Sequence, residues 1–346
     1  MKTNTFKDNL TKVFNQSKDY AIAQYEAFTE PGRSIKRKKK LKHILTLSFT
    51  YFFLLGLCFV ILFPTIQQIL QALRAPQDLN DPSVIWIPKT FSTLNLTISM
   101  RVLNYWKALF NTFRIATVSM ILQLFSTALA GYAFARLKFR GSNLLFIFVI
   151  ITIVIPPQAL GLTRYLYFRS FGLIGSEYSR FSLYMMNGLG MGIRSGIFIF
   201  IFRQFFAGLP KELEESAQID GAGVIRTFFQ VMLPNARGAL VTVALFSFVW
   251  AWNDSYFVGL FKIATEKFPL LTMQLLNAAE NTQAVYARLS YTGIVAELGQ
   301  DIWKNPMFLS AISNVSALLI MLPLLIGYLF VQKSFVESIE RTGIVG

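Results

Sequence analysis

Six long apolar runs limit what this chain can fold into more than any other feature of its sequence. They cover residues 44–63, 113–135, 144–158, 181–202, 239–252 and 307–331. A helix of about 20 apolar residues crosses the hydrocarbon core of a bilayer, where a helix satisfies its own backbone hydrogen bonds. The runs therefore predict an all-α integral membrane protein with about six transmembrane helices. Pro64 is expected to end the first helix, and Pro156-Pro157 to kink or end the third.

The basic charge of the chain has two possible explanations. A net charge of +15 in a soluble protein would suggest nucleic acid. In a membrane protein the excess of Lys and Arg on the inner side competes as an explanation, and we expect no nucleic-acid partner. The dense basic run at 33–42 makes residues 1–43 a cytoplasmic tail that can also hold anionic lipid head groups. This tail places both chain termini and the loop at 208–235 in the cytoplasm.

The residues that catalysis or metal binding needs are scarce. Cys58 is the only cysteine, so a disulfide within the chain and a cysteine zinc cluster are excluded. The single His43 argues against a histidine metal site or a Ser-His triad. No G-x-x-x-x-G-K-[ST] pattern is present, so the chain carries no recognisable nucleotide site. We expect no catalytic residue, metal ligand or enzymatic activity in this chain.

The loop at 208–235 begins with a pattern typical of a short helix. Pro210 suits a first turn, and acidic residues follow where the helix dipole favours negative charge, namely Glu212, Glu214 and Glu215. Gly221 is expected to end this helix. Ala217 and Gly221 are four residues apart and so share one nearly flat face. The backbone of a partner could approach that face closely.

A second short helix is predicted after the glycine turn. Ile225, Phe228, Phe229 and Met232 fall at the i, i+3, i+4, i+7 spacing of an amphipathic helix. Pro234 is expected to stop it. On pattern alone, this helix–turn–helix is either an ordinary hairpin that links two spans or a surface that a partner binds.

The spacing of this loop resembles the EAA loop of bacterial ABC-importer permeases. That motif reads E-A-A, three residues, G, nine residues, then I-x-L-P. The matching segments here are Glu215-Ser216-Ala217, Gly221 and Val231-Met232-Leu233-Pro234, with Ser216 and Val231 as mild replacements. Ile219-Asp220-Gly221-Ala222 also resembles the form common in the sugar-importing branch.

The resemblance extends over roughly residues 105–346. Four segments resemble parts of carbohydrate permeases. In order along the chain, they resemble the start of the transport domain, the approach to the loop, a W-N-D/E motif, and the short tail of the maltose-type second permease subunit. The matching segments are Ala130–Arg136, Phe202–Phe206, Trp252-Asn253-Asp254 and Phe335-Val336-Glu337. Residues 90–104 depart from the family as extra length.

The resemblance implies a type I ABC importer transmembrane domain and a division of the chain into five parts. These are a cytoplasmic tail at 1–43, a first transmembrane helix at 44–64, an external segment at 65–104, the transmembrane domain at 105–331 with the docking loop 208–235, and a cytoplasmic tail at 332–346.

The resemblance also implies the partners. They are a second, unlike permease subunit, two ATPase subunits that hold ATP and Mg, and an external solute-binding protein. This chain itself would then carry no cofactor and would lie in the cytoplasmic membrane of a bacterium.

By the same resemblance, the loop docks the ATPase. The implied docking residues are Glu214, Glu215, Ala217, Asp220, Gly221, Ala222, Leu233 and Pro234. Glu215 and Asp220 would hold the docking helix by charge-assisted bonds. Ala217, Gly221 and Ala222 would permit close approach, while Leu233 and Pro234 would end the second helix and brace it.

Four polar residues in or near the spans are candidates for a solute path, namely Gln123, Arg194, Asn253 and Asn314. Such residues can bond sugar hydroxyls, and they can equally make helix–helix hydrogen bonds. The family resemblance, and not these four residues, implies a sugar or oligosaccharide as the solute, with glycerol phosphate or another polar solute as the alternative. A secondary transporter would need a carboxylate near the middle of a span, and the six runs have none. A channel without an ATPase is excluded only by the loop motif.

Overall fold

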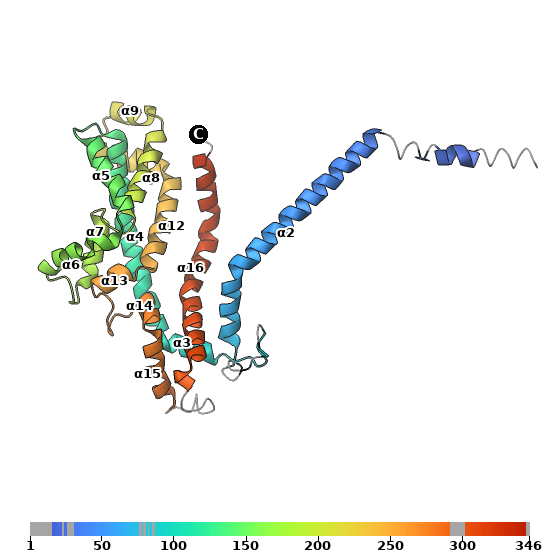
Figure 1. Ribbon diagram of the computed structural model, residues 1–346. Helices are drawn as coiled ribbons and strands as arrows, with labels where there is room; N and C mark the ends of the chain where they lie inside the picture. The colour runs from blue at the N-terminus through green and yellow to red at the C-terminus, as the bar shows by residue number, and fades with distance from the viewer. Residues whose placement is uncertain are drawn as a thin grey trace, which may run out of the picture. The chain divides into compact units, whose positions relative to one another are not determined.

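The computed structural model describes residues 16–22, 24–25, 31–75, 78, 81, 83–84, 87–290 and 302–343. The chain divides into two compact units, Met1–Ile66 and Gln67–Gly346. Helices make up most of the described part (Figure 1). Its only β-pairing is an isolated bridge between Arg74 and Phe91. The predicted all-α architecture is confirmed.

In the described residues, three helices are long and apolar enough to cross a membrane, and they lie in α2, α4 and α16. The number of spans rises to five if each of two bent helix pairs counts as one span. Their bounds are α2 Pro31–Leu73, α4 Tyr105–Arg136 and α16 Pro306–Gly343. The six apolar runs map onto α2, α4, α5 (Ser142–Val154), α7 with α8, α12 (Arg237–Trp252) and α16. Five of the six runs therefore coincide with candidate spans, although not at all of their ends, whereas the fourth run gives only a shorter apolar helix, α8 (Ser195–Gly208).

The end of the first helix differs from the prediction. α2 continues through Pro64 to Leu73. A proline inside a spanning helix removes one backbone hydrogen bond, and local adjustment of the neighbouring turns can satisfy the freed group. Pro156 acts as expected, because α5 stops at Val154 and the following helical segment, Pro157–Ser170, is turned by 107°.

The fourth apolar run is not one helix. It is divided between α7 (Ser179–Gly188) and α8 (Ser195–Gly208). In the turn between them, Gly190 has φ +72° and Arg194 has φ +61°. An added Cβ at Gly192 would lie 1.9 Å from Oδ1 of Asn187. This close approach and the left-handed backbone explain why a continuous helix does not form here.

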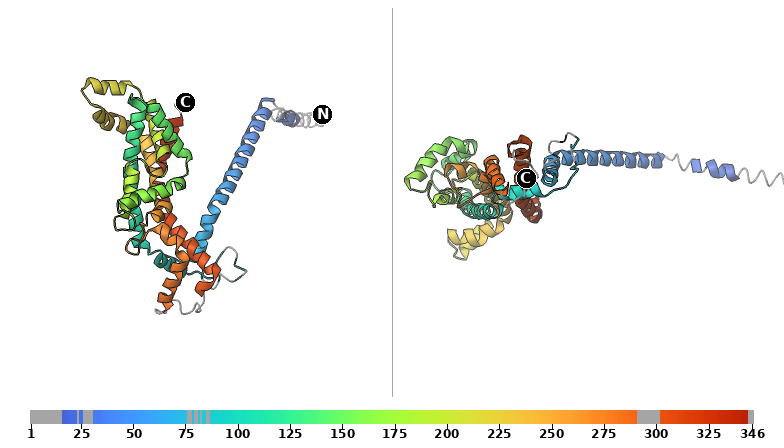
Figure 2. Two further views of the ribbon diagram at one scale, coloured as in Figure 1. Left: turned by 60° about the vertical axis from the view of Figure 1, so that its left-hand side comes forward. Right: turned by 90° about the horizontal axis from the view of Figure 1, so that it is seen from below.

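α4 lies at the centre of the second unit, where it packs along α8, α12 and α7. Figures 1 and 2 show α4, α8 and α12 side by side. α4 and α8 approach each other closely at Gly131, where an added Cβ would lie 2.4 Å from Cβ of Phe202. Around this point a core forms from aromatic and small side chains that include Tyr132, Phe206, Phe228 and Met232.

The second unit also contains several short helical segments. They are α3 Leu94–Val102, η2 Pro157–Leu160, α6 Gly161–Ser170, α13 Tyr256–Leu260, α14 Leu271–Leu276, α15 Ala278–Ser290 and η5 Ile302–Lys304. The extra length predicted at 90–104 contains α3. Its Ile98 and Val102 are buried against residues of α15 and α16, and the hydroxyl of Ser99 donates to the backbone oxygen of Ile312.

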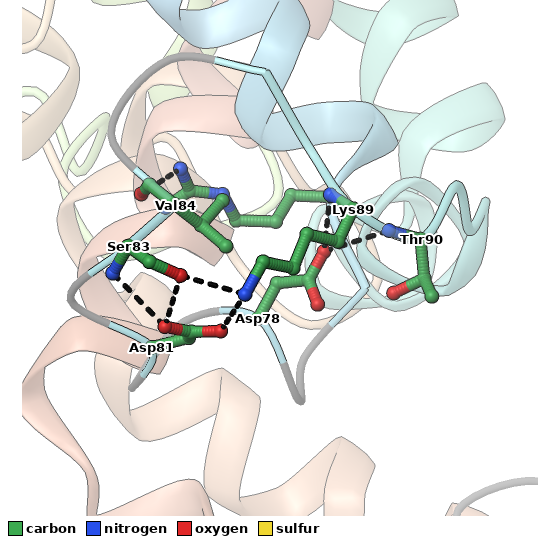
Figure 3. A network of polar contacts seen from close by, with 7 residues as sticks. Asp78, Asp81, Ser83, Val84, Lys89 and Thr90 are labelled. Carbon is green, nitrogen blue, oxygen red and sulfur yellow. Dashed lines mark hydrogen bonds and ion pairs between the residues drawn. The ribbon is translucent and has the colours of Figure 1, made fainter.

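Before α3, the chain closes onto itself through polar contacts (Figure 3). A carboxylate oxygen of Asp78 accepts hydrogen bonds of 2.9 Å from the backbone N–H groups of Lys89 and Thr90. Nζ of Lys89 forms an ion pair with Asp81, and Nη2 of Arg74 donates to the backbone oxygen of Val84. These bonds give part of the predicted external segment a defined structure.

Candidate docking loop and solute path

The first helix of the loop, α9, spans Glu212–Ile219 and lies beyond the ends of α5 and α8 (Figure 1). Three glutamates occupy its first turn, as predicted. Gly221 follows with φ +79°. The backbone N–H of Ala222 donates to the oxygen of Ala217 at 2.9 Å, and that of Gly221 to the oxygen of Gln218 at 3.0 Å. This is a Schellman motif, in which the left-handed residue is usually glycine.

The second helix of the loop runs from Val224 to Asn235. It consists of α10 (Val224–Thr227), a π-turn η3 (Phe228–Met232) and α11 (Leu233–Asn235). The prediction that Pro234 stops it is wrong, because the chain bends by 83° only after Asn235, where α12 begins. In the π-turn, Leu233 donates its N–H to the oxygen of Phe228, five residues back. The wider turn leaves room for the proline ring within the helix.

The π-turn also changes which side chains face outward. The spacing predicted that Ile225, Phe228, Phe229 and Met232 share one face. In the structure Phe228 and Met232 are buried, whereas Ile225 and Phe229 are 74% and 45% exposed. Because the hydrogen bond in a π-turn joins residues i and i+5, successive side chains are rotated differently from those of an α-helix. The i, i+3, i+4, i+7 rule therefore does not apply across it.

An exposed apolar patch therefore lies on this polar loop. We define it by four residues: Ile219, Val224, Ile225 and Phe229. Ile219, just before the glycine turn, is 86% exposed. A pocket of about 690 Å³ borders the patch, lined by Gly223, Val224, Ile225, Arg226, Phe229 and Gln230. The sequence pattern missed Ile219 and Val224, although two apolar residues flanking a glycine turn in an otherwise polar segment were a usable signal.

The predicted docking residues do not all face outward. Glu215 and Asp220 are exposed, as docking through charge-assisted bonds requires, and Gly221 has open space around its Cα. Ala217 is only 6% exposed, so it does not offer a flat outer face and that part of the prediction is wrong. The reason is that α9 packs on the π-turn and buries the side of the helix that carries this small residue.

The remaining predicted docking residues differ in exposure. Leu233 packs against the core around α4 and α8 and does brace the second helix. Pro234 is exposed. Ala222 is half-buried. Glu214 faces inward, where its carboxylate lies 3.7 Å from the guanidinium of Arg136.

Gln123, a candidate for the solute path, is buried among helices. Its Nε2 donates to the backbone oxygen of Ile193 at 2.7 Å and to Oγ of Ser195 at 2.9 Å. Its Oε1 accepts from Oγ of Ser247 at 2.5 Å. Gln123 is 3% exposed, and both of its amide atoms are used in contacts between helices. The structure thus favours the helix-packing alternative for this residue.

The two asparagines of the predicted path are also bonded within the protein. Nδ2 of Asn314 on α16 donates to Oε1 of Gln71 at 2.8 Å. Nδ2 of Asn253 donates to the backbone oxygen of Val249 at 3.0 Å, although Asn253 is exposed. The structure does not bring the four candidate solute-path residues together into one binding site.

Arg194 is different, because it is exposed and its guanidinium lies over the ring of Trp250 on α12, 4.6 Å from the ring centre. Trp250 is itself 39% exposed. A cation over an aromatic face is a stabilising contact. The pair leaves part of the indole and the guanidinium N–H groups open to another molecule.

Asp254, beside Asn253, caps a helix. Its Oδ1 accepts a hydrogen bond of 2.9 Å from the backbone N–H of Phe257 at the start of α13. The residue is 5% exposed. Burial raises the pKa of this carboxyl to about 6, against the lowering effect of the backbone N–H groups.

Comparison with known proteins places the chain in a family. Residues 124–341 match the family described as "Binding-protein-dependent transport system inner membrane component". The chain belongs to this family. The resemblance inferred from the loop spacing is therefore confirmed. The protein is a permease of a transport system and not an enzyme, and, as the family description states, transport depends on a separate binding protein.

Several curated relatives align over most of this permease. The maltodextrin transport system permease protein MalD of Streptococcus pneumoniae is 27% identical over 307 residues, 88% of this chain and 97% of MalD. The maltodextrin permease MdxG of Bacillus subtilis is 27% identical over 301 residues, 86% of this chain and 95% of MdxG. The arabinooligosaccharide permease AraQ of Halalkalibacterium halodurans is 31% identical over 225 residues, 64% of this chain and 76% of AraQ.

A solved structure supports the fold. A chain from the crystal structure of a bacterial ABC transporter involved in the import of the acidic polysaccharide alginate has a TM-score of 0.65. Its identity is 20%, and the match covers 86% of this permease and 98% of that chain. The permease therefore has the fold of an ABC importer subunit.

Proposed function

We propose that this permease is the membrane subunit of an ATP-driven importer of a sugar or oligosaccharide, powered by an ATPase that binds the loop at 208–235. The single observation that carries the proposal is the exposed apolar patch on that loop, formed by Ile219, Val224, Ile225 and Phe229. Exposed apolar side chains on a polar loop are typical of a protein-binding surface. The exposed carboxylates of Glu215 and Asp220 flank the patch and would bond to basic groups of the partner.

The proposed assembly contains four further chains. A second, unlike permease subunit lies beside this one, two ATPase subunits bind ATP and Mg, and an external solute-binding protein delivers the solute. Both termini and the loop face the cytoplasm of a bacterium, where ATP is available. This permease carries no cofactor or metal of its own, and membrane lipid surrounds its apolar helices.

The names of the relatives support carbohydrate as the solute class. They include permeases for maltodextrin, arabinooligosaccharides and alpha-glucosides. A relative named for uptake of osmoprotective compounds keeps another polar solute as the alternative. Uptake of radiolabelled maltodextrin, compared with labelled glycerol phosphate, in cells that express the whole transport system separates the two solute classes.

The contact between Arg194 and Trp250 is the part of the structure best suited to meet that solute. An aromatic face stacks on the apolar face of a sugar ring, and guanidinium N–H groups donate to hydroxyls. We expect Trp250→Ala and Arg194→Gln to raise the KM for uptake. Asn253→Ala and Asn314→Ala should change KM less, since both asparagines bond within the protein.

Docking is tested with two neighbouring residues of α9. Ile219 and Gln218 are both exposed, but only Ile219 belongs to the apolar patch. Ile219→Asp should weaken capture of the ATPase by about tenfold or more, as loss of a buried interface anchor does. Gln218→Asp should leave capture nearly unchanged. Equal capture by both variants, at equal amounts of membrane-inserted permease, would refute docking at this patch.

A further inference from the structure

Arg136, the last residue of α4, joins three segments of the chain. Its Nε donates to the backbone oxygen of Phe206 at 2.9 Å, and its Nη2 donates to the backbone oxygen of Leu209. Its Nη1 lies 3.7 Å from Oε2 of Glu214 in the first turn of α9. The Arg136 and Glu214 side chains are 7% and 15% exposed, so water screens this ion pair little.

The position of Arg136 matches the charges of the helix ends around it. Phe206 and Leu209 lie at the C-terminal end of α8, where the backbone oxygens carry partial negative charge. The oxygen of Phe206 also accepts a bond of 3.3 Å from the backbone N–H of Leu209. Glu214 adds a full negative charge from α9. A guanidinium has five N–H donors in a fixed plane and can serve all three acceptors at once. A lysine ammonium, which lacks this planar arrangement of donors, could not contact all three acceptors in the same way.

A second arginine, Arg203, also connects these two helices. Nε of Arg203 on α8 donates to the backbone oxygen of Phe134 on α4 at 3.4 Å. The Arg203 guanidinium also lies 4.1 Å from the ring centre of Phe146 on α5. Together with the tight contact at Gly131, these bonds hold the cytoplasmic ends of α4 and α8 together as one body.

Glu214 gives α9 a charged contact with that body, in addition to the packing of α9 on the π-turn. Its Oε2 faces Arg136, while its Oε1 is buried and accepts no hydrogen bond. Tyr132 on α4 also interacts with the Glu214 carboxylate through its hydroxyl. A buried carboxylate depends strongly on its charged partner, which here is Arg136. The docking residues Glu215 and Asp220, in contrast, face outward. The loop thus has exposed residues that could bind a partner, and one inward-facing carboxylate, that of Glu214, which contacts Arg136 at the end of α4.

We propose that Arg136 is a positioning residue that transmits displacement of α9 to the spans α4 and α8 through Glu214. This inference rests on the proposed ATPase docking and adds the internal connection that converts docking into movement of the membrane helices. Rigid elements joined by a buried charged pair move together. Loss of the pair should leave the ATPase bound but make its cycle ineffective.

The test compares two glutamates of the same helical turn. Glu214→Gln keeps the shape of the side chain and removes its charge, and Glu212→Gln makes the same change at an exposed position. The complete complex is purified in nanodiscs with each variant. Three quantities are measured: ATPase captured, ATP hydrolysed and solute transported per ATP. Arg136→Lys keeps the positive charge but loses the planar guanidinium with its five N–H donors. It is measured alone and together with Glu214→Gln.

We expect Glu214→Gln to keep the captured ATPase and to lower solute transported per ATP by about tenfold, a typical coupling between sites. Glu212→Gln should match the wild type. In the double variant, Arg136→Lys should add little to the effect of Glu214→Gln, because both break the same connection. Normal transport per ATP in Glu214→Gln would overturn the inference.

Two other outcomes are informative. Loss of the ATPase from Glu214→Gln would place Glu214 in the docking contact itself and overturn its positioning role, while leaving the proposed function standing. Failure of the wild-type permease to capture any ATPase would remove the proposed function, and this inference with it.

Discussion

The hydroxyl of Ser247 on α12 donates a hydrogen bond of 2.5 Å to Oε1 of Gln123 on α4. The same glutamine donates through Nε2 to Ser195 at the start of α8. One buried amide therefore connects three helices of the permease. Apolar packing gives little preference for one helix partner over another in lipid, so such polar contacts help decide which helices associate.

Gln123→Leu should destabilise this three-helix contact. The change leaves the Ser195 and Ser247 hydroxyls and the Ile193 oxygen without their partner, and we expect a loss of about 1–3 kcal/mol in the free energy of unfolding. Thermal unfolding in nanodiscs measures it. Gln204→Leu, at an exposed position on α8, is the control. Equal unfolding midpoints for the two variants would show that the buried bonds contribute nothing.

Gly131→Ala should separate α4 from α8. The new Cβ would lie 2.4 Å from Cβ of Phe202 and 3.0 Å from the backbone nitrogen of Arg203, neither of which can move without shifting a helix. Overpacking of this kind costs about 1–3 kcal/mol. Gly327→Ala on α16 meets nothing within 4 Å. That control should be neutral or stabilising by up to about 1 kcal/mol, as measured by the same unfolding assay.

Gly221→Ala should impair docking through backbone strain alone. A Cβ at Gly221 meets nothing, but the residue has φ +79°. This conformation costs a residue with a Cβ about 1–2 kcal/mol. Asn adopts it more readily, so Gly221→Asn should retain more ATPase capture and uptake than Gly221→Ala. If the two variants behave alike, the left-handed turn is not what docking requires.

The buried carboxyl of Asp254 should make stability depend on pH. Burial raises its pKa to about 6 from an ordinary value of 3.8, so the folded state binds this proton more tightly than the unfolded state. Between these two values the folded state holds more protons. Its stability therefore falls as pH rises from about 4 and levels off above about 6.

Asp254→Asn should remove that contribution, since the amide oxygen can still accept from Phe257 and carries no charge. Unfolding midpoints of the wild type and the variant should diverge as pH rises from about 4.5 to 7.5. Glu266→Gln, at an exposed position, should follow the wild type at every pH. Parallel curves for wild type and Asp254→Asn would contradict the assignment.

Asp78 should hold the segment before α3 closed. The backbone N–H of Thr90 is the main cause that keeps the pKa of this carboxyl below its usual value, and that of Lys89 contributes too. A lowered carboxyl pKa stabilises the fold above the ordinary value and ceases to do so as pH falls. Asp78→Asn should speed cleavage by trypsin after Lys89, whereas Glu280→Gln on α15 should not. Unchanged cleavage of Asp78→Asn would mean that these bonds do not close the segment.

Local sequence determined the helices, the glycine turn and the family of this protein. The apolar runs locate α4, α12 and α16, because a spanning helix is a local structure whose composition must match the bilayer. Gly221 ends α9, because the left-handed residue of such a cap favours glycine over any residue with a Cβ. The spacing of the loop indicated the family without any knowledge of contacts.

Only the tertiary structure decided which side chains face outward and which residues meet. The π-turn at Phe228–Met232 exposes Ile225 and Phe229, although the α-helical spacing had grouped them with buried residues. The continuation of α2 past Pro64 and the pairing of Arg136 with Glu214 were likewise invisible in the sequence. Long-range packing determines which of several local conformations of similar free energy is adopted. A single sequence does not show which distant residues make those packing contacts.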